Sequence, residues 1–260
     1  MQQQKNTPPS IEEQNTSDLM DYLRYMLDDI CEKIAEKFNL YDSERRPRKA
    51  FIVDVLSRYT CPCCAFRALT QMREQVEVDA IFRENHDLAV SMLVHTLRGM
   101  SQKDEYQIIV KEEARSEYGR LDVLIKRLNG GLLLVASGAS EVIVEIKTNM
   151  GFSLKQILRY LLQRPDATAV IWRVRKRQTL VIDGRKHRWL IALFANAIIQ
   201  QGLTILNGKF EECEHHPRKN SPYEIKNPQE TLDDFLTCLV EGLAQVAEIV
   251  LSILNGKQPN

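Results

Sequence analysis

The sequence has no excess of charge of either sign, because 35 lysine and arginine residues balance 35 aspartate and glutamate residues in a chain of 260. This balance excludes a histone-like protein and a polyanion binder that depends on a basic tail. Any contact with nucleic acid must therefore come from a local basic patch. The chain also lacks a run of about 18 apolar residues, so we expect no transmembrane helix and no membrane partner.

The N-terminal segment lacks the apolar stretch of a signal peptide and is rich in Gln, Asn, Pro and Ser. We therefore expect a disordered tail over 1–17 and a cytoplasmic location. The apolar fraction of 44% is that of an ordinary globular protein and excludes global disorder.

The hydrophobic pattern divides the rest of the chain into three parts. Apolar residues at helical spacing predict a helical part over 18–104. Alternating apolar residues and turn-forming glycines predict strands over 105–188, interrupted by a helix at 153–162. Helical spacing returns over 189–260. We expect one α/β domain, 18–260, with helical additions at both ends of its strand-rich core.

Three charged residues stand out in the predicted strands. Asp122 interrupts an apolar run, and Glu145 and Lys147 share one face of a strand because strand side chains alternate. Two carboxylates on neighbouring strands supply the oxygen ligands that Mg²⁺ and Mn²⁺ prefer, and a lysine beside them can orient or deprotonate water. These groups suit metal-assisted phosphodiester hydrolysis. The alternative is a buried salt bridge between Lys147 and one of the carboxylates.

These residues belong to a longer pattern, which resembles the PD-(D/E)XK nuclease superfamily. The pattern comprises Gly119-Arg120-x-Asp122, Glu145-x-Lys147 and Gln156-x-x-x-Tyr160. The last element is similar to that of the RecB-like exonuclease branch, which includes the CRISPR-associated RecB-like nucleases. Upstream, the segment that ends in Cys61-Pro62 looks like the helix and Cys-Pro element that opens those nucleases. The resemblance covers about 51–174.

The resemblance implies a restriction-endonuclease-like core, a central mixed sheet flanked by helices. It implies that Asp122, Glu145, the Ile146 carbonyl and a helical histidine bind the metal. His86 matches the place of that histidine, and His95, nine positions further along the same helix, is the competitor. The resemblance further implies that Lys147 positions the attacking water and that two residues of the following helix orient the site and the DNA strand, namely Gln156 and Tyr160.

The sequence departs from the family pattern at two points. The separation between Asp122 and Glu145 is 23 positions, longer than usual, and includes an additional predicted strand at 131–135. Leu121 replaces the proline that gives the superfamily its name, as is common in the RecB-like branch. Neither departure removes a ligand.

Six cysteines require a separate interpretation: Cys31, Cys61, Cys63, Cys64, Cys213 and Cys238. Three of them lie within four residues, a poor arrangement for a disulfide framework. Many nucleases of this branch hold a four-iron cluster, and Cys61 matches its first cysteine, but the later trio is absent. An iron–sulfur cluster, zinc and a structural role all stay open. The candidate ligands are Cys61, Cys63, Cys64 and Cys213, with His215 or His216 as an additional ligand for zinc.

A basic segment around Lys176 is the candidate DNA contact, the alternative being a solvated hairpin. The residues concerned are Arg120, Arg173, Arg175, Lys176 and Arg177. We expect a Mg²⁺- or Mn²⁺-dependent DNA nuclease, a single-strand or end-processing exonuclease in DNA repair or CRISPR adaptation. Its partners would be DNA and other nucleic-acid-processing proteins. The alternatives are a structure-specific or restriction-type endonuclease on the same core and a non-catalytic DNA-binding or assembly subunit.

Overall fold

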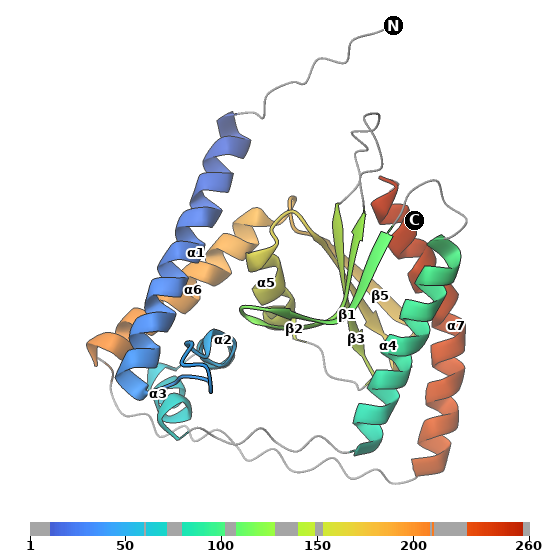
Figure 1. Ribbon diagram of the computed structural model, residues 1–260, viewed down its shortest axis with the longest axis horizontal. Coiled ribbons are helices and arrows are strands. Elements are labelled where there is room, and N and C mark those ends of the chain that lie inside the picture. Colours follow the sequence, from blue (N-terminus) through green and yellow to red (C-terminus); the bar gives the residue numbers. More distant parts are fainter. Residues whose placement is uncertain are drawn as a thin grey trace, which may run out of the picture.

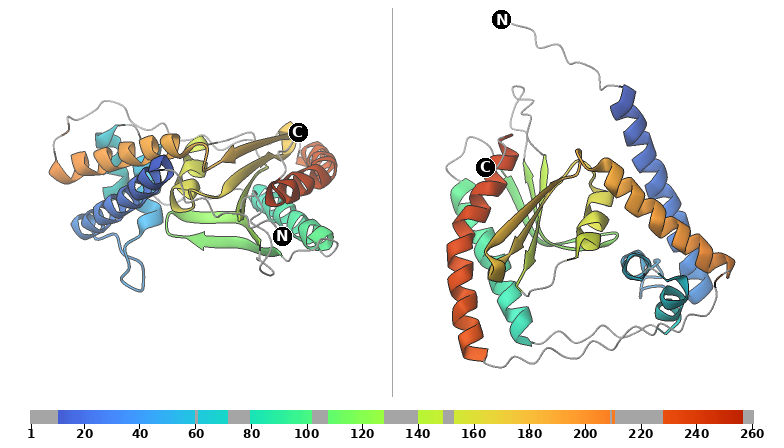
Figure 2. Two further views of the ribbon diagram at one scale, coloured as in Figure 1. Left: turned by 90° about the horizontal axis from the view of Figure 1, so that it is seen from above. Right: turned by 180° about the vertical axis from the view of Figure 1, so that it is seen from behind.

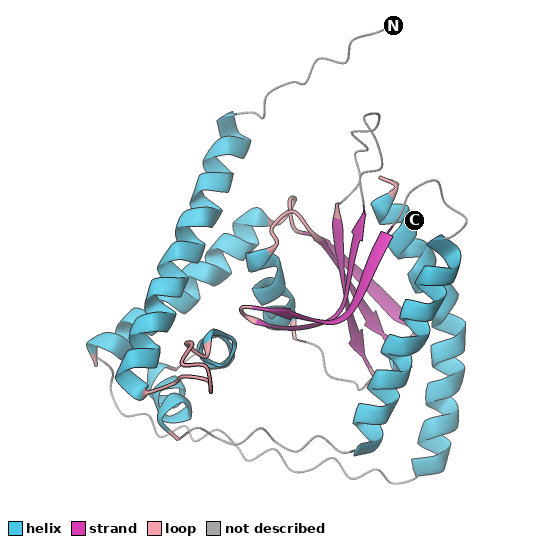
Figure 3. Ribbon diagram, viewed as in Figure 1, coloured by secondary structure: helices cyan, strands magenta, loops and turns pink. Residues whose placement is uncertain are grey.

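The computed structural model of the protein describes residues 11–59, 61–71, 80–101, 108–127, 140–148, 153–208, 210 and 228–256. A mixed sheet lies between two groups of helices (Figures 1 and 3). The helices are α1 (Ile11–Phe38), α2 (Lys49–Arg58), α3 (Pro62–Thr70), α4 (Ala80–Ser101), α5 (Leu154–Gln163), α6 (Arg188–Asn207) and α7 (Pro228–Leu254). The strands are β1 (Ile108–Ser116), β2 (Gly119–Arg127), β3 (Glu141–Lys147), β4 (Thr168–Arg173) and β5 (Gln178–Asp183).

The five strands lie side by side in the order in which they occur along the chain. Strands β3 and β4 are parallel and the other neighbours are antiparallel. Parallel neighbours need a crossover connection, and helix α5 provides it. The mixed α/β fold with a mixed sheet flanked by helices, expected from the sequence, is thus confirmed.

The sheet separates two hydrophobic cores, each covered by its own helices (Figure 2). Helices α2 and α5 contact one face, with α1, α3 and α6 packed against them, and α4 and α7 cover the other face. Strand β3 is buried on both faces, with Ile143 in the first core and Val142, Val144 and Ile146 in the second. A strand enclosed on both faces reads as a continuous apolar run, which is why Glu145 stands out there.

Two boundaries differ from those expected from the sequence. Helix α1 begins at Ile11, inside the predicted disordered tail, because Glu12, Glu13 and Gln14 are good helix formers that extend the packed helix toward its N-terminus. Residues 1–10 lie outside the described part of the chain. Strand β5 ends at Asp183, because the turn that contains Gly184 follows at once. The predicted strand at 131–135 also lies outside the described residues.

Two helices have the length and composition of a membrane span, which differs from the sequence expectation. They are α6, with a mean hydropathy of 1.6, and the segment Asp233–Leu254 of α7, with 1.7. Scattered polar residues interrupt both segments, so neither forms an unbroken apolar run. Both pack against the protein, α6 on α1 and α5, and α7 on α4 and the sheet. Core helices of globular proteins meet the same criteria.

Candidate active site

The candidate site forms where strands β2 and β3 part. Their antiparallel pairing runs as far as Val123 and Val144, and the next residues on the two strands are Asp122 and Glu145. The Oδ2 atom of Asp122 accepts a hydrogen bond from the backbone N–H of Ile146 at 2.7 Å. The Asp122 carboxylate thus accepts a hydrogen bond from a backbone N–H of β3 that β2 no longer pairs with, and this bond holds the side chain against β3.

A local distortion of β1 accompanies this separation. Glu113 has a left-handed backbone, with φ of 45°. It lies between Glu112, which pairs with Val123, and Ala114, which pairs with Leu121. The alternation of β2 is broken at the same level, since Leu121 and Leu124 belong to one core and Val123 to the other. A non-glycine residue in this conformation costs about 1 kcal/mol or more, which the packing around it must offset.

Glu145 is almost completely buried, with 1% of its surface exposed. Its Oε1 atom accepts hydrogen bonds from Lys147 Nζ at 2.5 Å and from Gln156 Nε2 at 2.6 Å. Its Oε2 atom is buried and has no hydrogen-bond partner among the described residues. A buried carboxylate oxygen without a partner is costly, so this atom requires an explanation.

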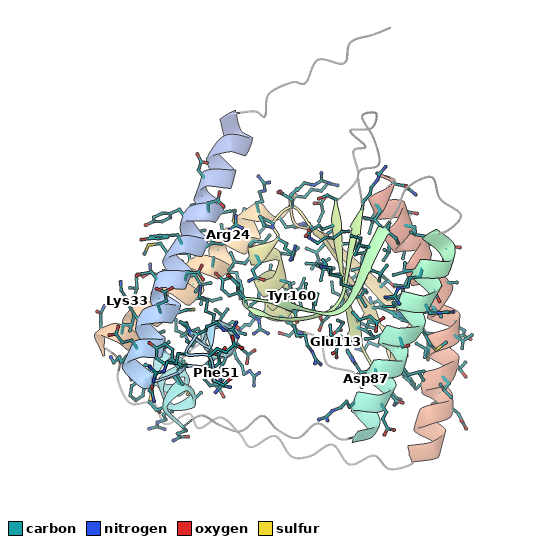
Figure 4. All side chains as sticks on the ribbon, in the orientation of Figure 1. Arg24, Lys33, Phe51, Asp87, Glu113 and Tyr160 are labelled. Carbon is teal, nitrogen blue, oxygen red and sulfur yellow. The ribbon has the colours of Figure 1, made fainter. Side chains whose placement is uncertain are left out.

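Helix α5 positions Gln156 and Tyr160 on one face, because residues four apart are neighbours on a helix. Gln156 Nε2 donates to the Tyr160 hydroxyl at 2.8 Å, and that hydroxyl donates to the carbonyl of Arg120 at 2.7 Å. Tyr160 is labelled in Figure 4. Gln156 Oε1 also accepts a hydrogen bond from Lys147 Nζ at 2.9 Å. Lys147, Gln156 and Tyr160 therefore form one hydrogen-bonded chain that leads from Glu145 to the start of β2.

Gly119 makes room for this chain. Its φ of 155° is a backbone conformation that other residues rarely adopt, and a Cβ atom there would lie 3.1 Å from Cε1 of Tyr160. The first residue of the Gly119-Arg120-x-Asp122 pattern is therefore explained by the close approach of the Tyr160 ring.

Helix α4 contributes a histidine to the site. His86 Nε2 lies 3.2 Å from Asp122 Oδ2. The next residue of α4, Asp87, is labelled in Figure 4. The hydrogen bond with Asp122 raises the pKa of His86, although burial opposes this shift. His95, on the same helix, is exposed. The structure therefore brings His86, and not its competitor, to the carboxylates.

Burial raises the pKa of Glu145 to about 7, and repulsion by Asp122 adds to the effect. The attraction of Lys147 and His86 opposes it without cancelling it. Burial likewise raises the pKa of Tyr160, so its hydroxyl stays a neutral hydrogen-bond donor. The site thus holds two carboxylates close enough for the charge of one to disfavour ionisation of the other, an arrangement that a cation would relieve.

The fit of a divalent cation can be judged from the donor set. The described residues contain no preformed group of three or more His, Cys, Asp or Glu side chains around one point. The donor set nonetheless suits a hard cation. Oε2 of Glu145 has no partner among the described residues, and the Glu145 and Asp122 carboxylates repel one another. Oδ2 of Asp122 already contacts Nε2 of His86. A bound metal ion would have to replace this contact for both side chains to act as ligands.

The predicted basic contacts are largely engaged within the protein. Arg173 Nη1 donates to Gln178 at 2.9 Å, Arg175 Nε to the Thr148 carbonyl at 3.0 Å, and Arg120 and Arg177 pair with glutamates. The exposed members of the set are Arg120, Lys176 and Arg177. The structure therefore leaves fewer candidate phosphate contacts at the surface than the charge pattern indicates.

The predicted cysteine ligands are only partly within the described residues. Cys63 and Cys64 are buried and Cys61 is half-buried, at the start of α3. Cys213 and the two neighbouring histidines lie outside the described part of the chain. Cys31 and Cys238 are buried, one in each of the two hydrophobic cores. A cluster or zinc at these cysteines stays a prediction, which elemental analysis for iron and zinc would test.

Two contacts near the site were not anticipated from the sequence. Arg159 of α5 pairs with Asp54 of α2 at 2.7 Å and anchors the helix that carries Gln156. Arg175 reaches the residue that follows Lys147. The sequence carries no signal for the first pair, because its members are far apart along the chain. For Arg175, the sequence predicts only membership of the basic segment and not this contact.

Comparison with known proteins adds no relative to this description. No protein-family model, curated protein or solved structure matches the chain significantly. The chemistry of the site therefore has to carry the functional proposal by itself.

Proposed function

We propose that the protein is a metal-dependent DNA nuclease of the PD-(D/E)XK type, with a restriction-endonuclease-like core, that hydrolyses phosphodiester bonds. One observation carries the proposal. The Oε2 atom of the buried Glu145 has no hydrogen-bond partner in the part of the chain that the structure describes and lies beside a second carboxylate, while Lys147 and Gln156 hold the other oxygen. A purely structural salt bridge would satisfy both oxygens of so buried a carboxylate.

Asp122, Glu145, the Ile146 carbonyl and His86 would hold a Mg²⁺ or Mn²⁺ ion. The bound ion would supply a hydroxide-like nucleophile and neutralise charge on the phosphate. Histidine is a poorer ligand for Mg²⁺ than for Mn²⁺, so the His86 contact favours Mn²⁺.

The chain's own residues supply the remaining parts of the chemistry. Lys147 Nζ, held by both Glu145 and Gln156, is placed to orient the attacking water and to balance negative charge on the scissile phosphate. Gln156 fixes the orientation of Glu145, and Tyr160 ties that amide to the β2 backbone. These hydrogen bonds hold the side chains of the site in fixed orientations before a substrate binds.

The family resemblance supports a single-strand or end-processing exonuclease, with a role in DNA repair or CRISPR adaptation. The exposed Arg120 and Lys176 are the phosphate contacts that we propose, and the backbone carbonyl of Arg120 accepts the hydrogen bond from Tyr160.

The test is a cleavage assay with end-labelled linear single-stranded DNA and closed circular duplex, each with Mg²⁺, Mn²⁺ or EDTA. We expect metal-dependent cutting of the linear strand by the wild-type protein and none by Glu145→Ala. Cutting of the circle would replace the exonuclease by a structure-specific or restriction-type endonuclease on the same core.

A non-catalytic DNA-binding or assembly subunit is the second candidate. It is favoured by the ion pair between Lys147 and Glu145 and by the lack of a preformed three-ligand group among the described residues. A ligand that binds only the folded state raises the melting temperature. If Mn²⁺ protects the wild-type protein but not Glu145→Ala, and DNA is bound without being cut, this second candidate replaces the nuclease.

A further inference from the structure

We propose that Arg175 is a positioning residue for Lys147, holding the end of β3 in place and connecting it to helix α7. The inference rests on the proposed function for the role of Lys147. The contacts that carry it involve residues outside the carboxylate site.

The first contact is at the end of the strand that carries Lys147. Arg175 Nε donates to the carbonyl oxygen of Thr148 at 3.0 Å, and Thr148 is buried, with 6% of its surface exposed. Hydrogen bonds from a charged donor are stronger than neutral ones. The bond fixes the carbonyl of Thr148, the residue that follows Lys147, and so restrains the end of β3 from which the lysine side chain extends.

The chain path explains why Arg175 reaches this position. The parallel register places Arg173 of β4 beside Lys147 of β3. The chain then enters a single 3₁₀ turn, Val174–Lys176, whose first residue is buried, and Arg177 ends the turn with a left-handed φ of 48°. The turn carries Arg175 over the end of β3.

Helix α7 holds this turn from the other side. The guanidinium carbon of Arg175 lies 5.8 Å from the ring centre of Phe235, which is fully buried. Arg177 Nε also pairs with Glu241 at 3.1 Å, an exposed contact that contributes little. The cation–π contact with Phe235 therefore connects α7, through Arg175, to the strand that carries Lys147.

The competing role for Arg175 is a direct DNA phosphate contact. The two roles predict different results on substitution. Loss of a phosphate contact weakens DNA binding and its salt dependence, and a lysine can replace the charge. Loss of a positioning contact lowers kcat at unchanged affinity, and lysine cannot reproduce the Nε donor geometry of arginine.

The experiment compares Arg175→Ala and Arg175→Lys with Arg185→Ala as the matched control. Arg185 is an exposed arginine at the opposite end of the sheet from Lys147. Steady-state cleavage gives kcat and KM, a DNA titration gives affinity, and hydrogen–deuterium exchange reports on residues 145–148. We expect both Arg175 variants to lose about 10- to 100-fold in kcat. Their KM and affinity should not change, and exchange over 145–148 should be faster.

The control should match the wild-type protein in all these measurements. Arg175→Lys keeps an aliphatic stem over Phe235, so it provides the test if Arg175→Ala fails to fold. A higher KM and weaker DNA binding at unchanged kcat and exchange would overturn the inference, as would wild-type behaviour of Arg175→Lys.

If the wild-type protein cuts no DNA, the proposed function fails. Exchange alone then decides: faster exchange in the variants supports the positioning role, and unchanged exchange overturns it.

Discussion

The amide of Gln156 and the carboxylate of Glu145 are joined by a hydrogen bond of 2.6 Å from Nε2 to Oε1. Because Lys147 donates to the same Oε1, the other carboxylate oxygen has no hydrogen-bond partner among the described residues. Lys147 of β3 and Gln156 of α5 thus together determine which oxygen of Glu145 is available to a ligand.

Gln156→Ala is therefore expected to reduce kcat without weakening DNA binding. Without the amide, Glu145 and Lys147 lose a shared partner and can adopt other rotamers, so we expect a decrease of about 10- to 100-fold. Steady-state cleavage and a DNA titration measure the two quantities. Gln200→Ala, the same change at an exposed site on α6, should match the wild-type protein. A variant that loses DNA affinity at unchanged kcat would show that Gln156 contacts the strand instead.

Glu145 should make the metal-free protein less stable as pH rises. Burial raises the pKa of Glu145 from 4.5 to about 7 in the folded protein, so between these values the folded state binds more protons than the unfolded state. The contribution of Glu145 to the free energy of unfolding is present below about pH 4.5 and is lost as pH rises through about 7, a change on the order of 3 kcal/mol. The Glu145→Gln variant lacks this pH-dependent contribution.

The measurement is chemical unfolding between about pH 5 and pH 8 in EDTA, comparing the wild-type protein with Glu145→Gln. The wild-type protein should lose more stability over this range. The raised pKa of His86, caused first by its hydrogen bond with Asp122, acts in the same direction in both proteins. Parallel stability curves for the two proteins would refute the account of Glu145.

Gly119→Ala should destabilise the fold by about 1–3 kcal/mol. The new Cβ would lie 3.1 Å from the Tyr160 ring, and the φ of 155° is unfavourable for alanine. Urea unfolding measures the change. Gly99→Ala is the control, because a Cβ at Gly99 has no atom within 4 Å and the residue lies inside α4. That variant should be neutral or more stable by up to about 1 kcal/mol. Equal free energies of unfolding for the two variants would contradict this explanation of Gly119.

The elements near the site could be predicted because their signals are local. The predicted strand that carries Glu145 and Lys147 coincides with β3, and the predicted helix at 153–162 coincides with α5 to within a residue. The short apolar run of β3 and the helical spacing of α5 each depend on a few neighbouring residues. The grouping of Gln156 with Glu145 followed from the family resemblance and not from periodicity.

The remaining features depend on contacts between distant parts of the chain. The left-handed conformation of Glu113 accompanies the parting of β2 and β3, and nothing in its sequence context requires it. Arg175 is one of several arginines in a basic segment, and only the turn after β4 directs it to Thr148. Charge patterns report the number of cations, whereas the fold decides which of them face solvent.

The central claim is that Glu145 and Lys147 act together in metal-dependent hydrolysis of DNA. Its most direct test is single-turnover cleavage of an end-labelled single strand in Mn²⁺ by the wild-type protein, Glu145→Ala and Lys147→Ala, with DNA affinity measured in parallel. We predict cleavage by the wild-type protein, loss of cleavage in both variants, and retained DNA binding in Lys147→Ala. Cleavage by Lys147→Ala at the wild-type rate would contradict the account.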